Sequence, residues 1–188
     1  METTLPKIQE LYEDTGLKIA QNDLNILLNQ PPRESWLKKH PIAKGVKYIP
    51  IERLEWLMTK IFFKWHLEIK QVQVIANSVS VTVRLHYLNP LSNEMLWQDG
   101  IGAMAIQTDK GKGAMDWNYA KSDGVMKAAP AAESYAFKDA AEKIGKLFGK
   151  DMNRADQIGY DSLAATFEIK EDKHAEIFNE ESDQNFNK

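Results

Sequence analysis

The feature of this sequence that most limits its fold is a run of strict alternation near the middle of the chain. Apolar side chains occupy every second position from Val79 to Tyr87, and Ser, Thr, Arg and His fill the positions between them. Because successive side chains of a strand point to opposite faces, this period predicts an antiparallel strand with one buried face. The chain is therefore expected to contain a sheet.

Strand patterns also lie on both sides of this run. Residues 65–75 alternate with a change of phase near Gln71, which predicts a β-bulge, and residues 95–101 form a third alternating segment. Short polar segments at 76–78 and 89–93 are typical of turns. Three consecutive strands joined by short turns predict an antiparallel β-meander of three to four strands.

Two helices are predicted to flank the meander. The first begins after Pro50 and carries an apolar stripe at the spacing i, i+3, i+4, i+7, i+8. The stripe consists of Leu54, Leu57, Met58, Ile61 and Phe62. The second, longer helix is predicted from Pro130 to about Phe148, with Gly149 ending it.

Short helices are predicted nearer the N-terminus. One covers residues 5–14, where Gly16 is available to end it, and the other covers residues 23–29, where Asn22 is the cap. The order of helix, meander and long helix predicts the α+β class, with the meander packed on the long α-helix.

Charge divides the chain into three parts, which we take as its organisation. Residues 1–30, an N-terminal helical segment, have a net charge of −3, and residues 31–160, the main domain, have a net charge of +5. Residues 161–188 have a net charge of −5 and are predicted to form a flexible acidic tail. A basic body between acidic ends indicates either a polyanionic ligand or simple solubility.

Several kinds of catalytic site are missing from the sequence. The chain has no cysteine, so it has no thiolate metal site and no cysteine nucleophile. It also lacks the GxxxxGK[ST] phosphate loop and the GxGxxG, HExxH and GxSxG motifs. A metal-dependent nuclease using Asp99, Asp109 and Asp116 is the remaining catalytic alternative. We expect a protein that is not an enzyme and needs no cofactor.

Lysines are spaced for binding along the predicted long helix. Asp139 is followed by Lys143, Lys146 and Lys150 at i+4, i+7 and i+11, which places all four on one helical face. A row of lysines can bind successive phosphates and release their counterions. The alternative is an ordinary solvated helix face.

Two further segments carry cations. In the predicted loop over residues 107–128, lysines lie on both sides of Trp117 and Tyr119, and aromatic rings of this kind stack on unpaired bases. Trp117 packing on the core or on a neighbouring subunit is the alternative. The other segment, before the first long helix, contains Arg33, Lys38, Lys39, Lys44 and Lys47.

Taken in order, several of these segments resemble the DNA-binding domain of the eukaryotic annealing protein Rad fifty-two. The strongest is the run AFKDAAEKIGKLFG at 136–149, with a fixed aspartate, basic residues after it and a closing Phe-Gly. The others are Val46-Lys47-Tyr48-Ile49, Arg53, Trp65, the strand at 79–85 and the predicted turn Asp99-Gly100-Ile101-Gly102. The resemblance covers residues 36–160. In its short length and its many lysines, the chain is similar to phage or prophage members of the family.

The resemblance implies a function. Members of the family form rings or open helical filaments, hold single-stranded DNA by its backbone in a basic groove, and pair complementary strands without ATP. The main domain is thereby expected to be a DNA-binding annealing and oligomerisation domain, acting in recombination and repair. By position, Lys143, Lys146 and Lys38 or Lys39 match basic residues of the family's groove.

Together with the loop, these matches define the expected site. The candidate DNA-binding residues are Lys38, Lys39, Lys47, Lys138, Lys143, Lys146, Lys150, Lys110, Lys112, Trp117 and Lys121. The expected partners are single-stranded DNA and further copies of the chain, with a single-strand-binding protein or an exonuclease as further candidates. No membrane segment or secretory signal is visible, so the expected location is the cytoplasm of a bacterial or phage-infected cell.

The chain also departs from the family. Glu142-Lys143 stands where the family often has two basic residues, the stretch from Gly102 to Asp139 is longer than in the eukaryotic members, and no recombinase-loading region follows. Assignment to the RecT/Red-beta branch of annealing proteins remains an alternative. A DNA-free oligomeric scaffold is the alternative from another class.

Overall fold

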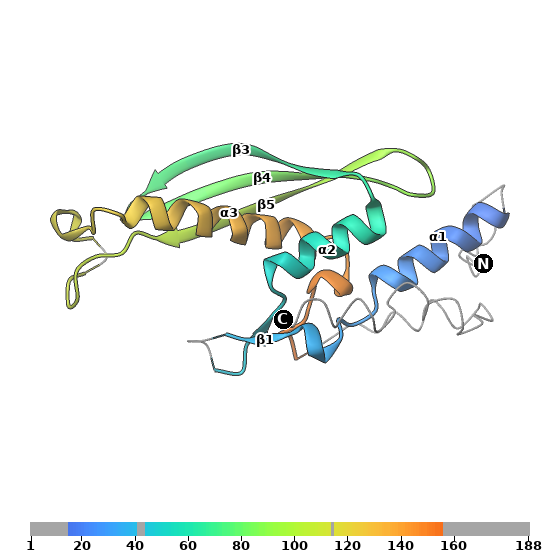
Figure 1. Cartoon of the computed structure of the whole chain (residues 1–188), viewed down its shortest axis with the longest axis horizontal. Helices are drawn as coiled ribbons and strands as arrows, with labels where there is room; N and C mark the ends of the chain where they lie inside the picture. The colour runs from blue at the N-terminus through green and yellow to red at the C-terminus, as the bar shows by residue number, and fades with distance from the viewer. Residues whose placement is uncertain (1–14, 41–43, 114, 156–188) are drawn as a thin grey trace, which may run out of the picture.

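The computed structural model describes residues 15–40, 44–113 and 115–155 of the chain. The fold is α+β, as predicted, and Figure 1 shows a sheet lying over helices. The described helices are α1 (Thr15–Leu28), α2 (Ile51–Phe62) and α3 (Gly124–Glu142), with short 3-10 turns η2 (Glu34–Trp36), η3 (Trp117–Tyr119) and η4 (Lys146–Phe148). The strands are β1 (Lys38–Lys39), β2 (Lys47–Tyr48), β3 (Trp65–Ile75), β4 (Ser78–Leu88) and β5 (Met95–Ala105).

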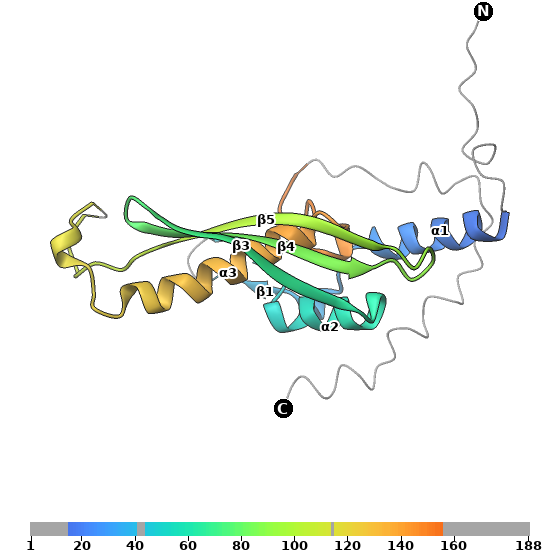
Figure 2. The same cartoon turned by 90° about the horizontal axis from the view of Figure 1, so that it is seen from above.

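The meander is present as a three-stranded antiparallel sheet in the order β3-β4-β5. The predicted bulge is also present, because the pairing of β3 with β4 shifts between Ile69 and Gln71. A separate pair, β1 with β2, forms an antiparallel hairpin below the sheet. Figure 2, seen from above, shows the three long strands side by side with α3 beneath them.

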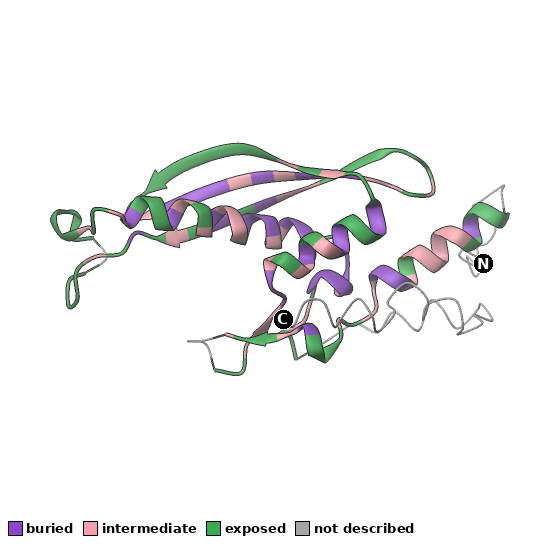
Figure 3. Ribbon diagram, in the orientation of Figure 1, coloured by how far each residue is buried: buried purple, intermediate pink, exposed green. Residues whose placement is uncertain are grey.

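The central strand β4 confirms the strict alternation. Its five apolar positions, Val79, Val81, Val83, Leu85 and Tyr87, are all buried, whereas the polar positions between them are partly exposed, except for Ser80, which is buried. In Figure 3 purple, buried segments follow β4 and the side of α3 beneath it, whereas β3 is green for most of its length. The hydrophobic core therefore lies between the sheet and the helices.

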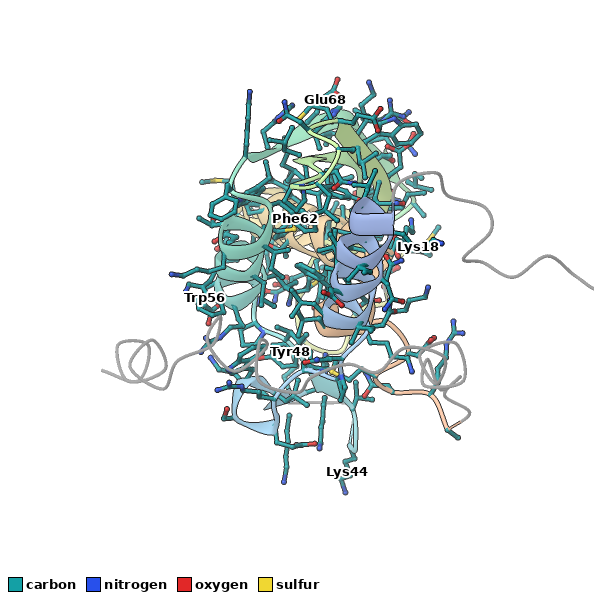
Figure 4. The ribbon with its side chains drawn as sticks, turned by 90° about the vertical axis from the view of Figure 1, so that its right-hand side faces the viewer. Lys18, Lys44, Tyr48, Trp56, Phe62 and Glu68 are labelled. Atoms are coloured by element: carbon teal, nitrogen blue, oxygen red, sulfur yellow. The ribbon has the colours of Figure 1, made fainter. Side chains whose placement is uncertain are left out.

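The helix α2 also matches the sequence prediction. Its five-residue stripe is buried, and Pro50 stands immediately before the first helical residue. Phe62, at the end of α2, packs against Tyr87 and Phe148 with ring centroids 4.6 Å and 6.2 Å away. Figure 4 shows Phe62 between the helices and the sheet, with Glu68 on the far, open face.

Helix α3 lies against β4 and β5 through small residues. Gly100 and Gly102 of β5 face the helix, and a Cβ atom at either position would overlap the backbone of Ala132, Ala136 or Ala140. The alanines recur every four residues and are fully buried. The predicted Asp-Gly-Ile-Gly turn is wrong: this segment lies inside β5, because its glycines let strand and helix backbones touch.

The bounds of α3 differ from the prediction of 130–148. The helix begins six residues earlier, at Gly124, so Pro130 lies inside it. It ends at Glu142 because Gly145 lies against α1, where a Cβ would overlap the carbonyl oxygen of Leu28. The chain then continues as η4, and Gly149, with φ of 105°, ends that turn.

The N-terminal prediction is wrong in its helix bounds. Helix α1 runs continuously through Gly16 and Asn22, although both residues favour a break. The cost of such residues is about 1 kcal/mol or less each, and the burial of Leu27 and Leu28 in the core outweighs it. Residues 5–14 and the predicted acidic tail at 161–188 lie outside the described residues.

Candidate nucleic-acid interface

A groove lies between the β1–β2 hairpin and the side of α3 that faces away from the sheet. It consists of two adjoining hollows of about 580 Å³ and 450 Å³, which share Asp139, Glu142, Gly149 and Asn153. We call the two hollows together the basic groove. Five cationic side chains line it: Lys47, Lys138, Lys143, Lys150 and Arg154.

Helix α3 forms one wall of the basic groove through a polar stripe. Tyr135, Lys138, Asp139 and Glu142 recur at i, i+3, i+4 and i+7, so they share one side of the helix. The opposite side carries the buried alanines and Phe137, which stacks on Trp65 with centroids 5.7 Å apart. The packing of the helix on the sheet thus turns this polar stripe toward the hairpin.

Lys138 lies between two tyrosine rings. Its ammonium is 4.9 Å from the ring centroid of Tyr48 on β2 and 5.8 Å from that of Tyr135 on its own helix. Within the described residues it has no ion pair within 4 Å, and partial burial lowers its pKa from the ordinary lysine value. Lys138 is therefore a cation held by aromatic faces, with its charge open to an anionic ligand.

The hairpin forms the other wall and is held by one amide side chain. Asn153 donates to the carbonyl oxygen of Lys47 and accepts from its backbone N–H, both at 2.9 Å. The Lys47 ammonium bonds both carboxylate oxygens of Glu34, at 2.7 Å and 2.9 Å. Asn153 thus fixes the hairpin beside the segment that follows α3, and Glu34 orients the Lys47 side chain.

Asp139 and Lys143 have structural contacts as well as a place in the groove. The Asp139 carboxylate accepts a 3.0 Å bond from the backbone N–H of Ile101 and pairs with Lys143 at 3.1 Å. Lys143 also donates to the carbonyl oxygen of Asp99. Both β5 groups point away from β4, so these two side chains bond the outer edge of the sheet.

The predicted lysine row is not a single helical face. Lys143 caps α3, Lys146 lies in η4, and Lys150 follows that turn, because the helix ends at Glu142. Lys150 lines the basic groove, whereas Lys146 lines a smaller hollow of about 140 Å³ beside it.

The remaining predicted cations near the hairpin lie outside the lining of the groove. Lys38 is 3.5 Å from Glu52, and Lys39 is exposed on β1. Lys47 and Lys150 line both the basic groove and the smaller hollow, so the two spaces adjoin.

The loop residues form a separate group. Lys110, Lys112 and Lys121 line a hollow of about 570 Å³. Figure 1 places this loop at the left-hand tip of the molecule, away from the hairpin. Trp117 is 48% exposed, and Lys112 lies 4.0 Å from the ring centroid of Tyr119. The structure therefore separates these loop residues from the basic groove, and Lys38, Lys39 and Lys146 belong to neither group.

The carboxylates of the nuclease alternative do not converge. Asp99 lies on the open face of the sheet, where it accepts bonds of 2.6 Å and 2.8 Å from Arg84. Asp116 bonds the N–H of Gly113 within the tip loop, and Asp109 lies in the same loop. Among the described residues no three His, Asp or Glu side chains gather as metal ligands.

Sequence reasoning missed several residues of the groove, among them Arg154, Tyr135, Glu142 and Asn153. Tyr135 and Glu142 lie three residues before Lys138 and three residues after Asp139, so the helical period places all four side chains on one side of the helix. That spacing could have identified both residues. Asn153 carries no such signal, because its partner Lys47 is 106 positions away in the chain.

In the part of the chain that the structure describes, no helix is long and apolar enough to cross a membrane. In comparisons, the chain matches no model of a known protein family and no curated protein.

Proposed function

We propose that this protein binds single-stranded DNA in the basic groove and anneals complementary strands, as an oligomer and without a nucleotide cofactor. The observation that carries the proposal is the groove itself, where five cations and two tyrosines line one continuous surface. The resemblance to Rad fifty-two supports it, because Tyr48 and Lys143 of the resembling segments both line that groove.

The groove suits a strand held by its backbone. Its cations lie on both walls, from Lys47 on the hairpin to Arg154 after α3. Lysines lower the repulsion between the phosphates of two approaching strands, and a fixed groove presents several bases at once. Base pairing then supplies the sequence recognition, so base-specific protein contacts are not needed.

Assembly follows from the small size of the site. One groove offers few cations, whereas a ring or filament repeats them along one strand and gains avidity. The inner face of β3 supports assembly, because Ile69, Val72 and Val74 are more than half exposed where α3 does not cover them. Exposed apolar surface of this kind is typical of contacts between proteins.

The tip group is a candidate for a separate DNA contact. Lys110, Lys112 and Lys121 bear positive charge beside the exposed ring of Trp117, a combination that suits an unpaired nucleotide. Annealing by such a protein would take place in the cytoplasm of a bacterial or phage-infected cell.

The test is annealing of two complementary dye-labelled oligonucleotides in EDTA, without nucleotide. We expect acceleration over the protein-free rate and a decline with added salt. Cleavage that needs magnesium would support the nuclease alternative, and an oligomer that ignores DNA would support the scaffold alternative.

A matched pair of variants assigns the groove. Lys150→Glu reverses an exposed groove cation, and Lys64→Glu reverses an exposed cation outside it; neither ammonium has a side-chain partner among the described residues. We expect Lys150→Glu to weaken oligonucleotide binding about tenfold at low salt and Lys64→Glu to change it about twofold or less. Equal losses would mean that DNA is held elsewhere.

A further inference from the structure

Glu142 occupies an unusual position for a carboxylate in a basic groove. It lies on the last turn of α3 and lines both hollows, so a strand following the groove passes over it. Its side chain lies against Gly149, where a Cβ would come within 3.5 Å of the Glu142 Cγ and 3.6 Å of an Oε atom. A Cβ at position 149 would thus stand at ordinary van der Waals distance from the Glu142 side chain, which places this carboxylate beside the segment after η4.

Of the three groove carboxylates, Glu142 alone is not paired with a cation in the described part of the chain. Asp139 pairs with Lys143, and Asp151 pairs with Arg154 at 3.2 Å. No lysine, arginine or histidine nitrogen of the described residues lies within 4 Å of Glu142. Glu142 is therefore the groove carboxylate whose charge would be left facing bound phosphates.

The charged and titratable groups that line the groove with Glu142 come from three segments. Its own helix contributes Lys138, Asp139 and Lys143; the segment after η4 contributes Lys150, Asp151 and Arg154; the hairpin contributes His40, Lys47 and Tyr48. Five cations and three carboxylates give the lining a net charge of +2. Neutralising Glu142 raises that charge to +3, a large relative change for a polyanion site.

We propose that Glu142 takes up a proton when a strand enters the basic groove and so sets how tightly the groove holds DNA at a given pH. The inference rests on the proposed function, since it assigns a regulator to the same site. An ionised carboxylate repels a phosphate, whereas a protonated one donates its O–H to a phosphate oxygen. The proton comes from solvent on binding and returns to solvent on release.

The surroundings of Glu142 favour this exchange. Although its side chain reaches solvent along the groove, partial burial raises its pKa above the ordinary glutamate value, and nearby Asp139 raises it further, while Lys138 acts in the opposite direction. Phosphates in the groove would raise the pKa again. The affinity for DNA therefore increases as pH falls through the pKa of Glu142 in the complex, by at most about tenfold per pH unit. It levels off below the pKa of Glu142 in the free protein.

The test measures proton uptake directly. Full-length protein is titrated with oligothymidylate, whose bases do not ionise between about pH 5 and about pH 8, in two buffers with different heats of ionisation. We expect uptake of up to about one proton per occupied groove, and affinity that rises as pH falls. Glu142→Gln should bind without that uptake and should hold the oligonucleotide near pH 8 as tightly as the natural protein does near pH 5.

His40 provides the control, since its imidazole lines the same groove. If Glu142→Gln keeps the pH dependence and His40→Gln abolishes it, the assignment to Glu142 is overturned. Binding in the groove without proton uptake overturns this inference and leaves the proposed function standing. Absence of binding at every pH overturns both.

Discussion

The two edges of the three-stranded sheet have opposite environments. At the β5 edge, α3 packs backbone against backbone over Gly100 and Gly102, and Asp139 and Lys143 bond the outward N–H and carbonyl groups of the strand. At the β3 edge no described element continues the sheet, and Val72 on its inner face is 57% exposed. One edge is closed within the chain, and the other is open.

The difference shows how the sheet obtains its cover. Close packing at β5 depends on the absence of side chains, whereas packing beneath β4 depends on large apolar ones. A helix close enough to touch β5 cannot also reach across to the far half of β3. The chain therefore covers its core on the β5 side and leaves an apolar strip exposed on the β3 side. A neighbouring copy that packed there would bury this strip.

The largest expected effect tests the closed edge. Gly102→Val should cost about 3 kcal/mol of unfolding free energy or prevent folding, because the new side chain meets the backbone of α3. Ala103→Val is the matched control, because Ala103 is exposed on the opposite face of β5. Urea unfolding measures both, and similar values for the two would show that the helix can move away.

The next effect compares the core with the open edge. Val83→Thr on β4 places a hydroxyl in a fully buried site and should cost about 2 kcal/mol. Val72→Thr makes the same chemical change on exposed β3 and should cost about 0.5 kcal/mol or less in the isolated chain. A large loss for Val72→Thr, dependent on protein concentration, would show that this strip is covered in solution.

A smaller effect concerns the side-chain bonds to the closed edge. Asp139→Ala removes the bond to Ile101 N–H and the pair with Lys143, and should cost about 1–2 kcal/mol. Glu133→Ala, on the same helix, is the control. Hydrogen exchange measures the loss of this bond directly. The amide of Ile101 should exchange faster in Asp139→Ala than in the natural protein, and an unchanged exchange rate would contradict the assigned bond.

The smallest expected effect is a pH dependence on the open face. The bidentate bond from Arg84 lowers the pKa of Asp99 below its usual 3.8. The pair therefore stabilises the fold above about pH 4, and this contribution disappears as pH falls through the lowered pKa. Unfolding of the natural protein and of Asp99→Asn should differ at neutral pH and converge in acid; a constant difference would contradict the pairing.

Much of the sheet could be predicted, because its information is local. The alternation of β4, the phase change at Gln71 and the stripe of α2 each lie within a dozen residues, and all three are confirmed. The end of α3 could not be predicted in this way. It depends on Gly145 meeting the carbonyl oxygen of Leu28, more than a hundred positions earlier.

The candidate site shows the same limit. The basic composition of the groove is visible in the sequence, but its geometry depends on Asn153 joining the hairpin to the segment after α3. Lysine spacing alone implied one helical row, and the structure distributes those lysines over a helix end, a 3-10 turn and the segment after it.

The bulge between Ile69 and Gln71 keeps the apolar side chains of β3 on one face of the sheet. With one extra residue in β3, Val72 and Val74 remain on the same face as Ile69, opposite Val81, Val79 and Val83 of β4. Without that local irregularity, the insertion would exchange the two faces for the rest of the strand. A chain lacking Lys70 would keep every later pair of β3 and β4 residues on the same faces of the sheet. Lys70 therefore contributes shape and twist to the sheet, while the residues before and after it determine which side chains form the apolar face.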